Sequence, residues 1–154
     1  MRKWVPVPYK ALFMLALLAG GSVLAHYHVA NQHYYPVTRL ASTDGYTFTL
    51  VQDRADTRGA CGEANDRFLE PLKAACHQCS IVYARCEREL QGLELQLLMG
   101  DPVPMHVVVA PNLRLAIQGP DKGVRGGCEA IATEIVKAGV KTATCVYPNT
   151  LRRP

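Results

Sequence analysis

Six cysteines constrain the fold of this chain more than any other feature of its sequence. They all follow an apolar N-terminal segment and are Cys61, Cys76, Cys79, Cys86, Cys128 and Cys145. An even number of cysteines in a small exported domain is typical of disulfide bonds, whereas cysteines in the cytosol stay reduced. The interpretation therefore depends on whether the chain is exported.

The first 25 residues predict export. Three basic residues within the first ten precede residues 11–25 (ALFMLALLAGGSVLA), which carry no charge. This run is shorter than the ~20 residues that a membrane-spanning helix needs, and it has the length of a signal-peptide core. Two outcomes stay open: a cleaved signal peptide, and an uncleaved anchor over residues 11–30. In both, we expect a periplasmic or extracellular domain, because the basic flank stays in the cytoplasm.

The charge of the exported part argues against one class of partner. The first 25 residues contain Arg2, Lys3 and Lys10 and no acidic residue. The rest of the chain therefore has 14 basic and 13 acidic residues. A net charge of +1 gives no general electrostatic attraction to a nucleic acid. We therefore expect no nucleic-acid partner.

The order of predicted elements indicates one small domain. We expect a linker over residues 26–44, an extracytoplasmic domain over 45–148 and a tail over 149–154. Apolar and β-branched runs predict strands over 46–52, 80–86, 105–110, 113–118 and 142–147. Helical spacing of apolar residues predicts helical structure from Cys61 to Cys79, with a kink or a division into two short helices at Pro71, and another helix from Cys128 to Val136. Residues 119–127 are expected to be a loop, and Leu93, Leu95 and Leu97 alternate as in a strand.

Two halves of this domain share a pattern. Gln52 ends a strand and is followed by Arg58-Gly-Ala-Cys61 at a helix start, and Gln118 is followed in the same way by Arg125-Gly-Gly-Cys128. The pattern predicts two βαβ units in one sheet with right-handed crossovers. The expected fold class is therefore α/β, an α+β sandwich with two main helices and a ferredoxin-like arrangement, braced by disulfides.

The layout of residues 46–147 is similar to that of SPOR domains, which are small periplasmic βαββαβ modules that bind glycan strands of peptidoglycan. Residues 138–143 (Ala-Gly-Val-Lys-Thr-Ala) have the texture of that family, whereas the 87–104 insertion and the six cysteines depart from it. The resemblance implies a glycan ligand, although a shared layout does not by itself assign a function.

The repeat also predicts how the cysteines pair. In each half, a cysteine at the helix start can reach the following strand, which gives Cys61–Cys86 and Cys128–Cys145. The remaining two cysteines, Cys76 and Cys79, would then pair with each other. Spacing alone leaves the other connectivities open.

The Cys76-His-Gln-Cys79 motif supports an alternative function. It has the spacing of thiol-disulfide oxidoreductases, in which these two cysteines would be catalytic. It follows a predicted helix, however, whereas a reactive cysteine gains its low pKa at a helix N-terminus. A zinc site of Cys76, His77, Cys79 and Cys86 is a further alternative, without a second CxxC partner.

Three other groups of residues carry weaker signals. The glycine-rich segment 119–127 could place an anion beside Lys122 and Arg125, but a plain crossover explains it. Glu87 and Glu89 would share a strand face as an acid–base pair, but a charged surface explains them. The remaining candidates are histidines for which structural roles suffice: His26, His28, His33 and His106.

We therefore expect a non-enzymatic module of the cell envelope without cofactor or metal. Its partner would be an envelope protein or a polysaccharide, with membrane contact through the N-terminal segment. The thiol-disulfide oxidoreductase remains the alternative.

Overall fold

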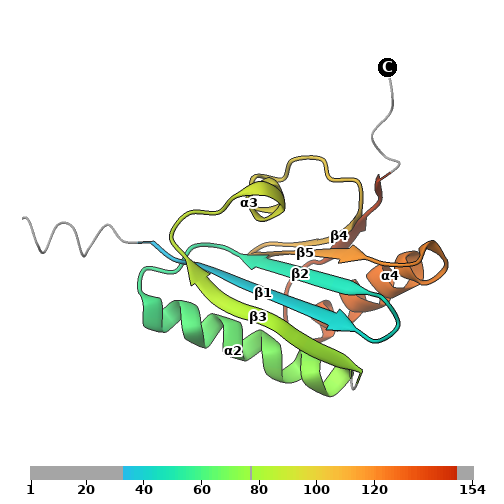
Figure 1. Ribbon diagram of the computed structural model, residues 1–154, viewed down its shortest axis with the longest axis horizontal. Helices are drawn as coiled ribbons and strands as arrows, with labels where there is room; N and C mark the ends of the chain where they lie inside the picture. Colours follow the sequence, from blue (N-terminus) through green and yellow to red (C-terminus); the bar gives the residue numbers. More distant parts are fainter. Residues whose placement is uncertain (1–32, 77, 149–154) are drawn as a thin grey trace, which may run out of the picture. The chain divides into compact units, whose positions relative to one another are not determined.

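The computed structural model describes residues 33–76 and 78–148. In this part of the chain, six strands form one sheet in the order β3-β1-β2-β5-β4-β6 (Figure 1). The elements follow one another as β1 (Tyr35–Ser42), β2 (Thr47–Gln52), α2 (Arg58–Ala75), β3 (Cys79–Glu87), α3 (Gly92–Met99), β4 (His106–Ala110), β5 (Leu113–Gln118), α4 (Asp121–Lys137) and β6 (Thr144–Val146). The predicted export segment and the tail lie outside these residues. None of the helices within them is both long and apolar enough to cross a membrane.

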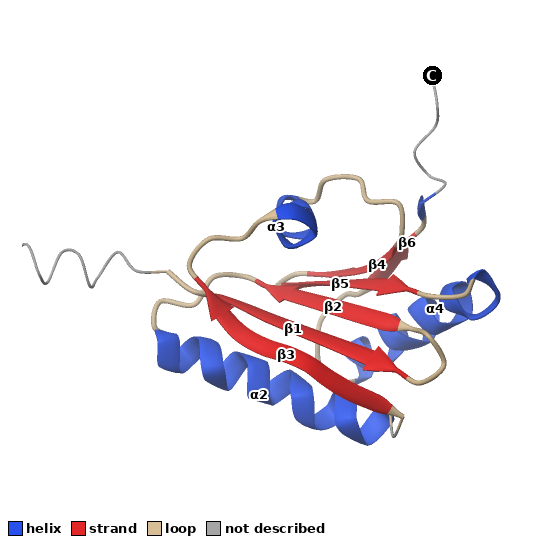
Figure 2. Cartoon of the chain, in the orientation of Figure 1, coloured by secondary structure: helices blue, strands red, loops and turns tan. Residues whose placement is uncertain are grey.

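The helices divide between the two faces of the sheet. Helices α2 and α4 lie on one face, where α2 contacts β1 and β3 and α4 contacts β4, β5 and β6. The shorter α3 lies on the opposite face, over β2 and β5 (Figure 2). We refer to these as the α4 face and the α3 face.

Each face carries its own apolar core. On the α4 face, Cys128 and Ala132 of α4 pack on Leu115 and Ile117 of β5. On the α3 face, Leu97 packs with a second set of strand residues: Val37, Val51, Val107 and Ala116. Because successive strand side chains point to opposite faces, the run of valines in β4 serves both cores.

The sheet consists of two ββαβ segments, β1-β2-α2-β3 and β4-β5-α4-β6. In each, the first strand lies between the other two, and all neighbouring strands are antiparallel. A mixed α+β fold braced by disulfides is thus confirmed. The ferredoxin-like arrangement is not confirmed. Each half has three strands and not the two of a βαβ unit, and its first strand, β1 or β4, lies between the two strands that the helix connects.

Three local predictions were wrong. The linker predicted over 26–44 contains β1, which lies inside the sheet between β3 and β2 and has four of its eight residues buried. The leucines at 93–97 lie in helix α3, because Leu93 and Leu97, one turn apart, both reach the α3-face core. The loop over 119–127 is mostly the first half of α4, which begins at Asp121.

Candidate functional site

Two disulfides tie a helix to an edge strand at corresponding places in the two halves. Cys61 of α2 bonds Cys86 of β3, and Cys128 of α4 bonds Cys145 of β6. Both helical cysteines are fully buried. These are the pairs that the repeat predicted, and buried disulfides of this kind stabilise a fold and leave no thiol for chemistry.

The third disulfide joins Cys76 and Cys79 at the junction of α2 and β3. Helix α2 ends at Ala75, so that Cys76 directly follows its C-terminus. The negative end of the helix dipole disfavours a thiolate there, in contrast to the N-terminal position of reactive cysteines. The position of the motif therefore gives no physical support to the oxidoreductase alternative.

The zinc alternative meets a similar obstacle. Its proposed ligand Cys86 is bonded to Cys61 and is not a free thiolate. His77 lies outside the described residues, and no group of three metal-binding side chains occurs within them.

Glu87 and Glu89 do not form the expected pair on a strand face, because β3 ends at Glu87. The Glu87 carboxylate instead lies 2.7 Å from Nε of Arg85. Both glutamates line an open hollow of about 550 Å³ at this end of the sheet. They are thus part of a charged surface.

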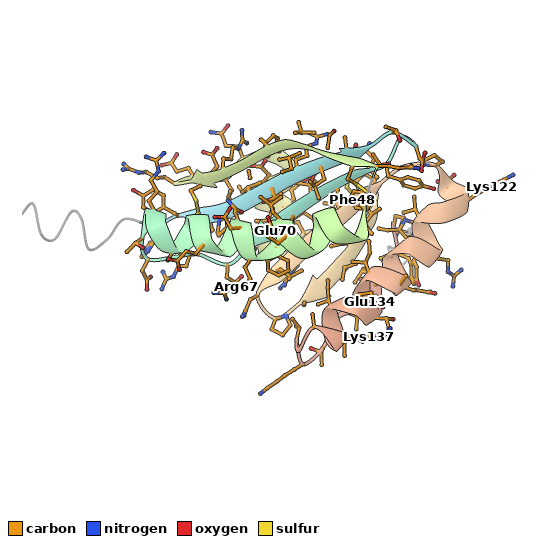
Figure 3. All side chains as sticks on the ribbon, turned by 90° about the horizontal axis from the view of Figure 1, so that it is seen from below. Phe48, Arg67, Glu70, Lys122, Glu134 and Lys137 are labelled. Atoms are coloured by element: carbon orange, nitrogen blue, oxygen red, sulfur yellow. A yellow bond between two sulfur atoms is a disulfide. The ribbon has the colours of Figure 1, made fainter. Side chains whose placement is uncertain are left out.

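The glycine-rich segment does not form an anion-binding loop. It begins α4, and Gly119 and Gly123 provide the space that the ring of Tyr46 occupies. Arg125 lies 4.9 Å from the ring centre of Tyr147 and 3.8 Å from the Glu129 carboxylate. Lys122 lies in the first turn of α4, and its side chain is exposed (Figure 3).

Tyrosine–arginine pairs recur over the surface. Arg85 lies 4.3 Å from the ring centre of Tyr83, and Arg88 lies 5.5 Å from that of Tyr34, as Arg125 does with Tyr147. In each pair a guanidinium covers one face of the ring. These faces are therefore not open for stacking against a sugar.

Two of these tyrosines have raised pKa values. Burial and a hydrogen bond of 2.8 Å from its hydroxyl to Glu94 raise the pKa of Tyr83. A hydrogen bond to Glu129 is the main cause that raises the pKa of Tyr147. Both phenols thus stay protonated at neutral pH, which suits donors of hydrogen bonds and not general bases.

The ring of His106 meets the edge of Tyr147, with ring centres 5.4 Å apart. His106 thus takes part in the contact between the start of β4 and the end of β6. This contact agrees with a structural role for His106. Two other candidate histidines, His26 and His28, lie outside the described residues.

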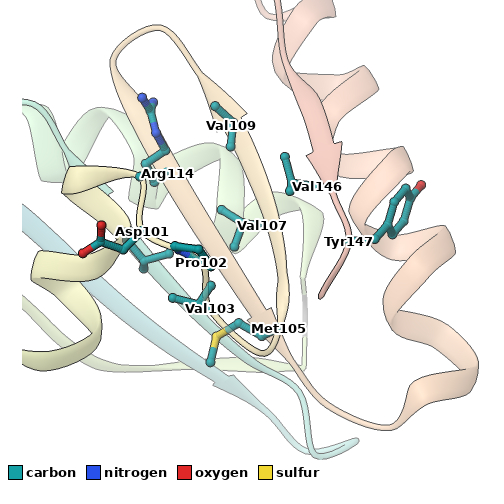
Figure 4. A pocket seen from close by; sticks show the side chains of 11 residues that line it. Asp101, Pro102, Val103, Met105, Val107, Val109, Arg114, Val146 and Tyr147 are labelled. Carbon is teal, nitrogen blue, oxygen red and sulfur yellow. The ribbon is translucent and has the colours of Figure 1, made fainter. Parts of the chain in front are cut away.

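An apolar hollow of about 340 Å³ is the most distinctive feature of the α3 face (Figure 4). Its floor joins the edge of the α3-face core, at the buried Val107, to the outer part of the sheet beyond α3, where Val109 of β4 and Val146 of β6 lie. The loop after α3 adds Val103 and Met105. We call this the upper hollow.

Charged side chains stand at the margin of the upper hollow. Arg114 donates from Nη1 to the carbonyl oxygens of Ala110 and Leu113 in the β4–β5 turn, and Asp101 lines the side next to α3. Val146 is 44 % exposed at its rim. An apolar floor with a polar margin has the composition of a binding surface.

Sequence reasoning missed this hollow. The apolar runs over 105–110 and 142–147 were available as a signal, but they read equally well as fully buried strands. Val109 and Val146 lie beyond the reach of α3, because this helix is short, and α3 was itself predicted as a strand.

A second, more open hollow of about 470 Å³ adjoins β6 on the α4 face. Val136 and Lys137 of α4 line one side of it, and Thr144 and Cys145 of β6 line the other. We call this the lower hollow. β6 therefore lies between two hollows.

Comparisons of this chain with family models, with curated proteins and with solved structures found no match.

Proposed function

We propose that this domain is an extracytoplasmic module without catalysis that binds a partner protein through the surface around β6. Its three disulfides are compatible with an oxidising location outside the cytoplasm. The observation that carries the proposal is the upper hollow with the exposed Val146 at its rim. Val103 and Val107 are already buried, so the gain in free energy from removing apolar surface from water would come mainly from the exposed Val146.

The composition of the surface favours a protein over a polysaccharide. Sugars are bound by open aromatic faces and by polar groups, whereas the lining of the upper hollow is mostly aliphatic. Its one aromatic residue, Tyr147, has the guanidinium of Arg125 over its ring. The three tyrosine–arginine pairs each cover one ring face. Branched apolar residues and methionine are typical of the centre of a protein interface.

Two substitutions of equal chemistry test the proposal. Val146→Asp places a charge at the rim of the upper hollow, and Val82→Asp places one on the opposite edge strand, where Val82 is 54 % exposed. The tagged full chain would be isolated in mild detergent from the producing organism after reversible crosslinking. Proteins that accompany it would be quantified by mass spectrometry.

We expect the wild type and Val82→Asp to retain the same partner and Val146→Asp to retain about tenfold less, since burying an unpaired charge costs more than ~1.4 kcal/mol. Equal retention by both variants would contradict the proposal. The ligand is a glycan if wild type and Val146→Asp sediment equally with peptidoglycan and the amount of every co-isolated protein is the same for both. Thermal melts of both variants verify that they fold.

A further inference from the structure

The pairing of all six cysteines leaves methionine as the oxidisable sulfur of this domain. No free thiol remains for an oxidant to attack, because every cysteine is in a disulfide. The described residues contain two methionines: Met99 ends α3, and Met105 lies in the loop between α3 and β4. A mild oxidant outside the cytoplasm would therefore modify sulfur on the α3 face.

The two thioethers differ in how easily an oxidant reaches them. Met99 is 69 % exposed, more than any other large apolar residue among those described. Met105 is partly buried, since it packs on the α3-face core and lines the upper hollow (Figure 4). Because the rate of oxidation follows the exposure of the sulfur, Met99 should react first and Met105 more slowly.

The reaction with hydrogen peroxide converts an apolar side chain into a polar one. A lone pair of the thioether sulfur attacks one peroxide oxygen, the S–O bond forms, the O–O bond breaks and water leaves. The sulfur thus loses the two electrons that the peroxide gains, and the product is methionine sulfoxide.

The position of each methionine decides what its sulfoxide does. At Met99 the new oxygen stays in water. At Met105 it becomes a strong hydrogen-bond acceptor in the upper hollow beside Val103 and Val107, whose side chains offer no donor. The guanidinium of Arg114 lies at the opposite end of the hollow (Figure 4). Covering an acceptor without giving it a donor costs free energy, so a bound partner would be disfavoured.

We infer that Met105 is a site of oxidative modification at which the sulfoxide weakens binding in the upper hollow. Met99 is a faster-reacting site without this effect. The inference rests on the proposed function and specifies how its surface is regulated. Reduction by methionine sulfoxide reductases would reverse it, because they restore the thioether.

Graded oxidation of the full chain by hydrogen peroxide in mild detergent tests the inference. Peptide mass mapping would follow the sulfoxide at each methionine, and we expect Met99 to react at least about threefold faster than Met105. The same samples would be assayed for the partner protein whose retention depends on Val146. Retention should be unchanged while Met99 alone is oxidised and should fall about tenfold once Met105 is. Treatment with reductases for both sulfoxide epimers should restore it.

Leucine provides the matched controls, because it keeps the volume of methionine and lacks the sulfur. Met105→Leu should retain the partner throughout the oxidation, whereas Met99→Leu should lose it as the wild type does. A Met105 that stays reduced after Met99 is fully oxidised would overturn the inference, as would an equal loss of partner in Met105→Leu or full retention by the Met105 sulfoxide.

Val146→Asp without oxidant separates this inference from the proposed function. If that variant loses the partner and oxidised Met105 does not, the proposed function stands and only the regulation fails. If neither loses it, both fail.

Discussion

The ring of Tyr46 lies directly against Gly119, so closely that any side chain at position 119 would overlap it. The pairing of β2 with β5, in which Thr47 faces Gln118, brings the two residues together. Gly123, in the first turn of α4, makes room for the hydroxyl end of the same ring. Tyr46 thereby covers the junction at which the chain leaves β5 and enters α4.

Gly119→Ala should destabilise the domain by about 1–3 kcal/mol, because the new methyl group overlaps the ring and the packing must shift. Gly127→Ala is the matched control. Position 127 lies within α4 with open space around it, so alanine should be neutral or stabilise by up to ~1 kcal/mol through its better helix propensity. Urea unfolding of both variants measures the two values. Equal effects would show that Tyr46 does not occupy this place.

The Cys128–Cys145 bond should behave as a single unit. Cys128→Ser and Cys145→Ser should each lower the free energy of unfolding by about 3 kcal/mol, since either one releases the same loop in the unfolded chain. The double variant should cost little more than either single one. Losses that add up in denaturant unfolding would argue against this pairing.

The Cys76–Cys79 bond should contribute less to stability. It closes a loop with a sequence separation of 3, against 25 for Cys61–Cys86, and loop-closure entropy predicts roughly 2 against roughly 3.5 kcal/mol. Replacing both Cys76 and Cys79 with alanine should therefore cost less than replacing Cys61 and Cys86. The reverse order in urea unfolding would contradict the entropic account.

The ease with which the Cys76–Cys79 bond is reduced distinguishes a structural from a catalytic pair of cysteines. We expect no thiol to be alkylated before strong reduction, because all six cysteines are paired. Intact-mass spectrometry after alkylation, with and without mild reduction, measures this. Selective alkylation of Cys76 and Cys79 after mild reduction would favour the oxidoreductase alternative.

Tyr83 should make stability depend on alkaline pH. Burial and the hydrogen bond to Glu94 raise its pKa above the ordinary value of 10.0, so the folded state favours the neutral phenol. The stabilisation is fully present below pH 10.0 and is lost as the pH rises through the folded-state pKa. Tyr83→Phe should therefore be about 1 kcal/mol less stable than the wild type near neutrality. This difference in stability should narrow as the pH rises above 10.0 and through the folded-state pKa of Tyr83.

A spectroscopic titration of the phenolate provides the control. Glu94→Gln should lower the pKa of Tyr83, because it removes the neighbouring carboxylate charge. A stability difference between Tyr83→Phe and wild type that stays constant across this range would show that the phenol is not coupled to folding.

Local features of the fold could be predicted from the sequence, and non-local ones could not. Strand β5 and the three disulfide pairs follow from alternation and from the repeat. The predicted repeat matched Gln52 with Gln118, but these two residues lie on opposite faces of the sheet. Gln52 donates to the Ala64 carbonyl, on the face that α2 covers. Gln118 follows Ala116 of the α3-face core and Ile117 of the α4-face core, so alternation places it on the α3 face. A shift of one residue reverses the faces of a strand, and only the pairing with neighbours fixes it.

The candidate site escaped prediction for a related reason. A run such as Val107–Val109 is equally compatible with a covered and an uncovered strand, and the difference lies in how far α3 and its following loop extend. That extent depends on the docking of Leu97 and Val103 on the sheet. The position of β6 at an edge of the sheet likewise follows from strand order, which sequence spacing does not determine.

The most direct test of the binding surface is photo-crosslinking in the living producing organism. A photoreactive amino acid would replace Val146 at the rim of the upper hollow, or Val82 on the opposite edge as the control. We predict one crosslinked partner protein of constant mass from position 146 and none from position 82. Crosslinks from position 82 alone, or from neither position, would contradict the claim that the surface around β6 binds a partner.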